Sequence, residues 1–419
     1  MERLLPGPGL GSAAQGDAGC VTGGRAREQL DQDAERGILM AGKIRLYRWE
    51  ETYVVASDVN NQKLRKAVVE ELVMDRALSH DKDPTYATEA TGKKVEFPLD
   101  KSLVLDDIVK VGLDLETGLG YRLLSDKKVY EVALGKNGDA RAEKLDDAKY
   151  GCCTWAIDPS ASGGLLYCGH ANEGKITSFG APKNGSRKQA QKVDVPVATD
   201  WTSGVEDVRV YAAADGRRAY ALSGVVGGKR KFGLVDLTKS DSDSGIDVVG
   251  RDKVFGTVDV SESVSRIVIS SDDRYALVAD RMCIQRILLE KNLVTTISQN
   301  EAVLSWPAIV AVDGKTYCVY AVQESHKIAF KIVDLSNPEM PATYGTPVTN
   351  AAEKPPLQPL FHEPGTKKVW GFLRTDKHAA VIAFEVSVPS GSITFGRLGT
   401  EVEEAESSLS RQTFFVTSW

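Results

Sequence analysis

The sequence contains the acidic, imidazole and guanidinium side chains that hydrolysis by general acid–base catalysis requires. His170 and Glu173 are close in sequence, whereas Arg281 and Glu324 lie much further along the chain. Such groups catalyse a reaction only if the fold brings them to one place, where each group can shift the pKa of its neighbours. Sequence order assigns no Ser/His/Asp or Cys/His set, because these sets are defined by geometry. The sequence therefore identifies no catalytic residue.

Three shorter motifs partly match ligand sites. DSDSGID (241–247) has Asp at alternate positions, as in the first half of a calcium loop, but lacks the Glu at position 12. GGKRKFG (227–233) is basic and Gly-rich but lacks the spaced first Gly and the Ser/Thr of a phosphate loop, which favours a hairpin corner. Cys152 and Cys153 are adjacent, too close for metal-ligand spacing, and we expect them on opposite sides of a strand. We expect neither a metal nor a cofactor.

The composition is that of a globular protein with a sizeable core. Of 419 residues, 42% are hydrophobic and 26% charged, and the formal net charge is −6. Without a long Lys/Arg block we expect no direct nucleic-acid binding, and no apolar run approaches the roughly 20 residues of a membrane span. The six cysteines are scattered in strand-like surroundings, which favours buried, reduced thiols in a cytoplasmic or nuclear protein over a disulfide framework or zinc site.

One pattern recurs along the chain: an apolar strand, a tight acidic turn, an aromatic residue and a second strand. It is clearest in VISSDDRYALVADRMCIQRILL (268–289) and returns in VRVYAAADGRRAYALSG (208–224) and PAIVAVDGKTYCVYAV (307–322). Asp-Gly and similar pairs supply the positive φ angles of tight hairpins. We expect the aromatic residue to be a structural wedge between neighbouring units. It recurs as Tyr121, Tyr167, Tyr220, Tyr275, Tyr317 and Trp370.

Two further strands follow each hairpin, so that each unit has four strands. One more unit, which starts at residue 43, precedes all of these units. Seven such units predict an all-β fold: a seven-bladed β-propeller of four-stranded antiparallel blades over 41–419, with a disordered N-terminal extension at 1–39. The expected blades are 43–100, 103–145, 152–196, 206–260, 264–298, 306–345 and 357–398, with a closing strand at 411–419. We expect this last strand, RQTFFVTSW, to pair with the first or last blade and so to remove an exposed edge.

The repeated units resemble WD40-like and lactonase-like propeller repeats. SSDDRYALVAD (270–280) is similar to the SPDGRYxYVAN pattern of the lactonase-like repeats, and KIVDLSNPEMP (331–341) looks like a strand ending in LVIVD-type repeats. The Gly-His and Trp-Asp pairs of WD40 repeats are missing, and Asp236-Leu237 and Asp334-Leu335 occupy the place of the second pair. The resemblance implies a propeller and no particular subfamily.

In a propeller, the corners between second and third strands emerge on one face, and many charged residues fall at these positions. Corner loops are commonly polar without having a function. An aromatic residue amid charge, as at Trp201, is nevertheless the usual composition of an interaction hot spot, and we expect this tryptophan to be exposed. The candidate partner-binding residues are His170, Glu173, Trp201, Lys229, Arg230, Asp280, Arg281, Glu324, His326, Arg374, Asp376 and His378.

The sequence favours a non-catalytic scaffold that mediates protein–protein interaction by presenting loops of several blades to a partner within a complex. A rigid closed ring suits this role, because its loops are ordered before the partner binds. The alternative is a propeller hydrolase of the lactonase type, or a small-molecule-binding propeller, that uses the channel mouth. Its residues would be His170, Glu173, Arg281 and Glu324.

Overall fold

A computed structural model represents the chain. It describes residues 42–54, 63–79, 84–96, 110–114, 119–123, 129–133, 141–144, 152–158, 165–170, 174–179, 192–196, 201, 203–213, 216–239, 247–324, 327–338, 342–345, 357–374, 381–399 and 408–418. The extension expected at 1–39 and most of the calcium-like motif lie outside these ranges. In the described ranges, no helix has the length and apolar character needed to cross a membrane.

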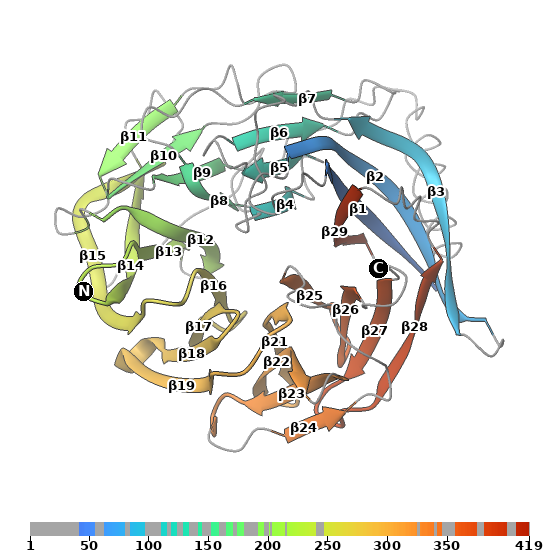
Figure 1. The fold of residues 1–419 in the computed structure, drawn as a ribbon. Coiled ribbons are helices and arrows are strands. Elements are labelled where there is room, and N and C mark those ends of the chain that lie inside the picture. Colours follow the sequence, from blue (N-terminus) through green and yellow to red (C-terminus); the bar gives the residue numbers. More distant parts are fainter. Residues whose placement is uncertain are drawn as a thin grey trace, which may run out of the picture. The chain divides into compact units, whose positions relative to one another are not determined.

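The described chain is almost entirely β-strand and forms antiparallel four-stranded sheets (Figure 1). The first sheet contains β4 (Lys110–Asp114), β5 (Leu119–Leu123), β6 (Val129–Ala133) and β7 (Arg141–Lys144). The second sheet contains β8 (Cys152–Asp158), β9 (Leu165–His170), β10 (Lys175–Phe179) and β11 (Lys192–Pro196). The next contains β12 (Val205–Ala213), β13 (Gly216–Ser223), β14 (Lys229–Lys239) and β15 (Asp247–Ser261). The fourth sheet contains β16 (Arg266–Ile269), β17 (Tyr275–Asp280), β18 (Cys283–Leu288) and β19 (Leu293–Gln299). The fifth sheet contains β21 (Ala308–Val312), β22 (Lys315–Glu324), β23 (Lys327–Asp334) and β24 (Ala342–Gly345).

A larger sheet joins the two ends of the described chain. It has nine strands in the order β20-β25-β26-β27-β28-β3-β2-β1-β29. Their bounds are β20 (Ser305–Trp306), β25 (Gln358–His362), β26 (Lys368–Arg374), β27 (Val381–Ser387), β28 (Ile393–Gly399), β3 (Thr85–Glu96), β2 (Lys63–Leu78), β1 (Lys43–Val54) and β29 (Ser408–Ser418). Two four-stranded antiparallel groups meet within it, because β28 and β3 pair in parallel over Arg397–Gly399 and Thr85–Ala87.

Each sheet contacts the sheet that follows it in the sequence. β5 contacts β8, β12 contacts β8 and β16, β16 contacts β21, and β21 contacts β25. The circuit closes through the nine-stranded sheet, because β29 contacts β4 and β3 contacts β7. A closed succession of four-stranded antiparallel sheets is a propeller-like arrangement.

The hydrophobic core lies between neighbouring sheets, and the recurring aromatic residue belongs to it. Tyr220 packs in a cluster with Ile267 and Val278 of the next sheet. Tyr275 packs in the same way with Cys318 and Tyr320. These tyrosines and Trp370 are almost completely buried, which agrees with the wedge role expected from the sequence. Large aromatic side chains suit this role because each one buries a large apolar surface.

The acidic turns have the positive φ angles that their sequences predict. Asp273 has a φ of 53°, and Asp313 and Gly314 have φ values of 50° and 75°. The first of these turns also ties neighbouring sheets together. Tyr220 Oη donates to Asp273 Oδ1 at 2.6 Å, and Thr316 Oγ1 donates to the adjacent Asp272 Oδ2 at 3.3 Å. Asp272 and Asp273 therefore link the sheets on either side of their own.

The C-terminal strand pairs with the first strand of the described chain. β29 and β1 run antiparallel from Val54 opposite Ser408 to Arg45 opposite Ser418. The pairing expected for RQTFFVTSW is therefore present, and the strand begins before the expected residue 411. Gln358 Nε2 adds a buried hydrogen bond of 2.9 Å to the backbone oxygen of Gln412. This strand covers an edge of β1 that would otherwise present unpaired backbone groups.

Three of the six cysteines have described side chains. Cys168, Cys283 and Cys318 are buried and free of disulfide bonds, as expected from their strand-like neighbours. Burial raises the pKa of the Cys318 thiol, because a low-dielectric environment disfavours the thiolate. These thiols are packing residues of the core.

Candidate partner-binding surface

The described candidate residues other than Trp201 lie at or beside the connection between the second and third strands of their sheets. They are His170 at the end of β9, Lys229 and Arg230 at the start of β14, Asp280 and Arg281 after β17, Glu324 at the end of β22 and Arg374 at the end of β26. The remaining candidates, Glu173, His326, Asp376 and His378, lie outside the described residues. The structure therefore places the described candidates at equivalent points of five sheets.

Two of the candidates are buried, which contradicts their expected place on an exposed surface. Trp201 and His170 are each 1% exposed. The sequence suggested an exposed tryptophan because charged residues surround it, but its large apolar surface gains more from packing ahead of β12. His170 Nε2 lies 2.5 Å from Thr177 Oγ1 on β10, so its imidazole is held inside its own sheet. Neither side chain lies at the surface where a partner would bind.

The connection between β13 and β14 exposes two apolar side chains. Val225 is 42% and Val226 52% exposed. Val226 and Lys229 exchange backbone hydrogen bonds across Gly227 and Gly228, whose φ angles are 60° and 77°. A two-residue turn with positive φ at both positions favours glycine, which explains the Gly-Gly pair. The hairpin corner predicted for this motif is confirmed, and its tight turn leaves the valines in solvent.

The two basic residues after this turn have different environments. Lys229 is exposed, and its Nζ lies 3.3 Å from Asp259 Oδ2. Arg230 is largely buried, its Nη1 lies 3.3 Å from Glu206 Oε2, and its Nε donates to the backbone oxygen of Glu262 at 2.9 Å. Arg230 therefore supports the corner from within, whereas Lys229 is available to a partner.

The connection between β17 and β18 exposes a third apolar side chain. Met282 is 47% exposed. Its backbone oxygen accepts a hydrogen bond of 2.9 Å from the Asn300 N–H, and the Arg281 oxygen accepts one of 2.8 Å from the Val303 N–H. Asp280 Oδ1 accepts from the Arg281 N–H. The corner is thus held by the backbone, so Met282 is presented from a fixed position.

A turn at residues 261–263 contacts both of the hairpins whose corners are exposed. The Glu262 backbone oxygen accepts from Arg230, and the Ser261 N–H donates to Gln285 Oε1 on β18 at 2.8 Å. We call the exposed groups around this turn the corner patch. Its exposed residues are Val225, Val226, Lys229, Glu262 and Met282, and the half-buried Arg281 lies beside Met282. Apolar side chains with charged neighbours, including a methionine that can adapt its shape, are typical of interaction surfaces.

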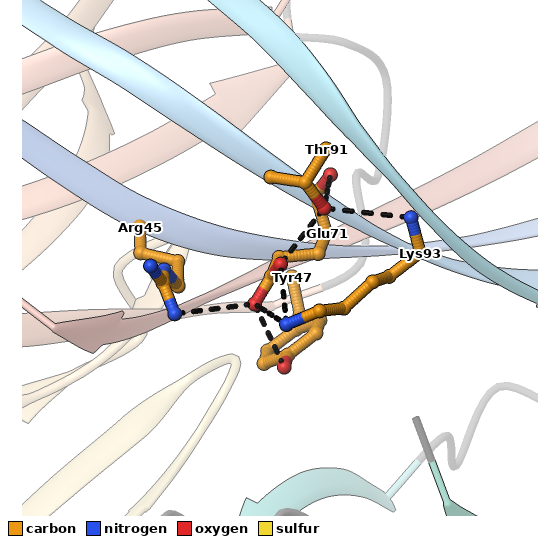
Figure 2. A network of polar contacts seen from close by, with 5 residues as sticks. All are labelled: Arg45, Tyr47, Glu71, Thr91 and Lys93. Atoms are coloured by element: carbon orange, nitrogen blue, oxygen red, sulfur yellow. Dashed lines mark hydrogen bonds and ion pairs between the residues drawn. The ribbon is translucent and has the colours of Figure 1, made fainter. Parts of the chain in front are cut away.

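A second group of polar residues surrounds the buried Glu71 on β2 (Figure 2). Tyr47 Oη donates to Glu71 Oε1 at 3.1 Å, and Thr91 Oγ1 donates to Oε2 at 2.7 Å. Lys93 Nζ lies 3.0 Å from Oε2, and Arg45 Nη1 lies 3.6 Å from Oε1. These residues come from the adjacent strands β1, β2 and β3. The signal of this group in the sequence is the acidic pair Glu70-Glu71 inside the otherwise apolar run AVVEELVM.

The surroundings of Glu71 keep it ionised. Burial alone would raise the pKa of Glu71, but the hydrogen bonds from Thr91 and Lys93 and the charges of Lys93 and Arg45 hold it below its usual value. Burial, followed by the charge of Glu71, raises the pKa of the Tyr47 hydroxyl. A saturated carboxylate and a neutral phenol are poorly suited to accept or transfer a proton, so the network is suited to holding three strands in register.

A third polar group connects the first strands of neighbouring sheets. Asp207 on β12 is fully buried and accepts a hydrogen bond of 2.8 Å from the Ile267 N–H of β16. Arg209 Nε donates to the Ile267 oxygen at 3.1 Å, and the Arg266 guanidinium lies 4.6 Å from the centre of the Trp306 ring. Desolvation, then the charge of Arg209, lowers the pKa of Arg266 to about 10, which leaves it protonated at neutral pH. The group joins β12, β16 and β20.

The residues considered for hydrolysis that the structure describes lie on different sheets. His170 contacts Thr177 at the end of β9, whereas Glu324 Oε1 lies 3.6 Å from Lys331 Nζ on β23. Lys331 also forms an ion pair with Glu301. Arg281 belongs to the β17–β18 corner, and Glu173 lies outside the described residues. Among the described side chains, no group of three or more His, Cys, Asp or Glu residues is arranged to hold a metal ion.

No protein-family model matches the chain, and a search of curated proteins found no match. Among solved structures, the chain is similar to one described as dihydro-heme d1 dehydrogenase NirN in complex with DHE. The two share 13% sequence identity, and the TM-score is 0.44. The alignment covers 88% of this chain and 75% of that protein.

Proposed function

We propose that this protein is a seven-bladed β-propeller that acts as a non-catalytic scaffold and binds another protein through the corner patch. The nine-stranded sheet then corresponds to two blades, of which β29-β1-β2-β3 is the one that combines both chain ends. The buried, free cysteines of the described chain suit a reducing compartment, and we place the protein in the cytoplasm or nucleus.

The observation that carries this proposal is the exposure of Val225, Val226 and Met282 at neighbouring corners. Exposed apolar side chains clustered within a charged surface are typical of sites that another protein covers. Both corners are fixed by backbone hydrogen bonds, so binding would cost little conformational entropy. Lys229 and Arg281 would contribute electrostatic steering at the rim of the patch.

Affinity purification of the full chain with quantitative mass spectrometry tests the proposal. The test variant is the double substitution Val226→Asp with Met282→Asp, which places carboxylates where apolar contact is expected. We expect recovery of a stoichiometric partner to fall by about tenfold or more, as for truncated hot-spot residues. The matched control is Leu293→Asp, since Leu293 is also exposed, at 51%, but lies at the start of β19.

Two results would contradict the scaffold role. One is that the native chain recovers no stoichiometric partner. The other is that the double variant recovers the same partner in the same amount as the native chain. The melting temperature of both variants should remain close to that of the native protein, because substitutions at exposed sites rarely change stability strongly.

A further inference from the structure

Arg286 on β18 carries a buried charge that has no counter-ion in the described part of the chain. Among the described residues, five charged side chains are at most 8% exposed, and Arg286 is one of them at 7%. The other four are Glu71, Asp207, Lys331 and Glu363, and each has an oppositely charged side chain at 3.6 Å or less. Arg286 forms no ion pair with a described residue. A buried charge normally has an ionic partner, because removing it from water is costly.

Arg286 uses only part of its hydrogen-bonding capacity. Its Nη1 donates to the backbone oxygen of Leu335 at 2.5 Å, and its Nη2 donates to Thr295 Oγ1 at 2.9 Å. Its Nε is buried and has no hydrogen-bond partner among the described residues. The Nε–H and one Nη–H of a guanidinium project from the same edge of the planar group, so together they can hold two oxygens of one anion.

Further donors lie around the ring of Tyr275, which the Arg286 guanidinium contacts. Arg286 Cζ lies 6.0 Å from the centre of this ring, and Arg274 Cζ lies 5.4 Å from it. Arg274 is exposed, and within the described segments neither its guanidinium nor the Tyr275 hydroxyl has a hydrogen-bond partner. Thr295 Oγ1 accepts from Arg286, so its own proton remains free to donate. These groups supply several donors and two positive charges.

The acidic side chains of the adjoining turns are engaged elsewhere. Asp272 accepts from Ser270 Oγ at 2.6 Å and from Thr316 Oγ1 at 3.3 Å. Asp334 Oδ2 lies 3.1 Å from Lys315 Nζ. Neither carboxylate forms an ion pair with a guanidinium in the described part of the chain. Both positive charges around the tyrosine ring are therefore left for a ligand.

We propose that Arg286 and Thr295 form a binding site for a phosphate group, with Arg274 adding a second positive charge. A phosphate group carries nearly two negative charges at neutral pH, and its oxygens match the spacing of the guanidinium donors. A carboxylate carries one charge and would compensate only one guanidinium. Thr295 is half-buried on the outer strand β19, so it lies on the side from which a ligand reaches Arg286.

Melting temperatures of the full chain in phosphate and in chloride, at equal ionic strength and neutral pH, test the site. Each variant is compared with its own melting temperature in chloride. A ligand that binds only the folded state stabilises it, so we expect the rise in phosphate to be about 2 °C larger for the native chain than for Arg286→Met. Arg286→Lys keeps the charge but lacks the planar pair of donors, and it should lose most of this difference.

Arg397→Met is the matched control, because Arg397 is an exposed arginine on β28. It should respond to phosphate like the native chain. Phosphate also stabilises proteins in general by exclusion from their surface, and that effect should be the same in all variants. An equal rise in the native chain, Arg286→Met and Arg397→Met, or no rise in the native chain, would overturn the proposal.

Phosphoserine as a second probe distinguishes a free phosphate ion from a phosphate group on a larger molecule. A rise with inorganic phosphate alone assigns the site to the free ion, and a rise with both probes assigns it to phosphate monoesters as well. Either result supports the site when Arg286→Met abolishes it, and contradicts the site when Arg286→Met leaves it unchanged.

The phosphate site does not depend on the proposed function. Arg274 precedes β17 and Met282 follows it, so the two residues lie at opposite ends of this strand. Val226→Asp with Met282→Asp should respond to phosphate like the native chain, and Arg286→Met should recover a partner at the corner patch as before. Failure of one proposal is therefore distinguishable from failure of the other.

Discussion

At the scale of single residues, Glu71 shows what a buried carboxylate requires. Tyr47 stands directly opposite it in the β1–β2 pairing, and β3 adds Thr91 and Lys93. A buried ionised group without such donors would lose several kcal/mol of solvation. The two nearby cations remain partly exposed, at 39% for Lys93 and 38% for Arg45. Removing the carboxylate would leave their charges hydrated, but Thr91 and Tyr47 would lose their acceptor.

We expect Glu71→Gln to lower the free energy of unfolding by about 2 kcal/mol, since the amide nitrogen would face donors from Thr91 and Lys93. Urea denaturation measures this change. The control Glu89→Gln alters an exposed residue of β3 and should change stability by less than about 0.5 kcal/mol. Equal effects of the two substitutions would contradict a stabilising role for the network.

The difference in stability between the native chain and Glu71→Gln should also depend on pH, in a direction that the pKa of Glu71 determines. The pKa of Glu71 is lowered in the folded protein, so its contribution is complete above the usual glutamate pKa of about 4.3 and is lost as the pH falls through the folded value. The stability difference between the native chain and Glu71→Gln should therefore shrink as the solution becomes more acidic. A difference that grows toward low pH would show that the carboxylate is not stabilised by its donors.

At the scale of elements, β29 secures the first strand of the described chain. It covers the edge of β1, and it places Phe414 with its ring centre 5.4 Å from that of Phe372 on β26. Phe414 is 1% exposed and belongs to the cluster that includes Ile44 and Trp370. The strand therefore contributes both backbone pairing and core volume.

We expect Phe414→Ala to destabilise the protein by about 3–5 kcal/mol, because it leaves a cavity between β29 and β26. Deletion of residues 407–419 should lower the melting temperature further, since β1 then has an unpaired edge. Differential scanning calorimetry measures both. Thr413→Ala, at the half-buried neighbouring position, is the control for Phe414→Ala and should change the melting temperature little. An unchanged melting temperature after the deletion would show that β29 does not hold the sheet together.

At the scale of the whole molecule, a salt bridge joins segments far apart in the sequence. Arg76 Nη1 on β2 lies 2.8 Å from Glu363 Oε1, which follows β25, and Trp370 Nε1 donates to the same carboxylate at 3.2 Å. The parallel pairing of β28 with β3 lies in the same nine-stranded sheet. Such non-local contacts form only after a long loop has closed, which slows folding.

A double-mutant cycle on Arg76→Ala and Glu363→Ala should give a coupling energy of about 1 kcal/mol. The exposed pair Lys367–Asp313, whose side chains are 56% and 72% exposed, is the control cycle and should give less than about 0.5 kcal/mol. Urea denaturation of each variant supplies the data. Equal coupling in both cycles would mean that the Arg76–Glu363 contact does not help to hold the ends together.

Features that depend on neighbours in the sequence were predictable. The turns at Asp273 and at Asp313-Gly314 require positive φ, and their residue types favour it locally. The burial of Tyr220 and Tyr275 follows from their apolar strands. The burial of Trp201 and the surroundings of Glu71 were not predicted, because they depend on packing with residues from other strands.

The strands, the turns between them and the residues at the corners follow from alternation, turn chemistry and local propensity, which the amino-acid sequence contains. Which corner residues are exposed to solvent depends instead on packing between segments that are far apart in the sequence. Lys229 and Arg230 are adjacent and both basic, yet the first is exposed and the second is held by Glu206 and the Glu262 backbone. Successive strand residues point to opposite sides, and the neighbouring segments determine which side is covered. The exposed set at Val225, Val226 and Met282 arises in the same way, from two hairpins brought together by the turn at 261–263.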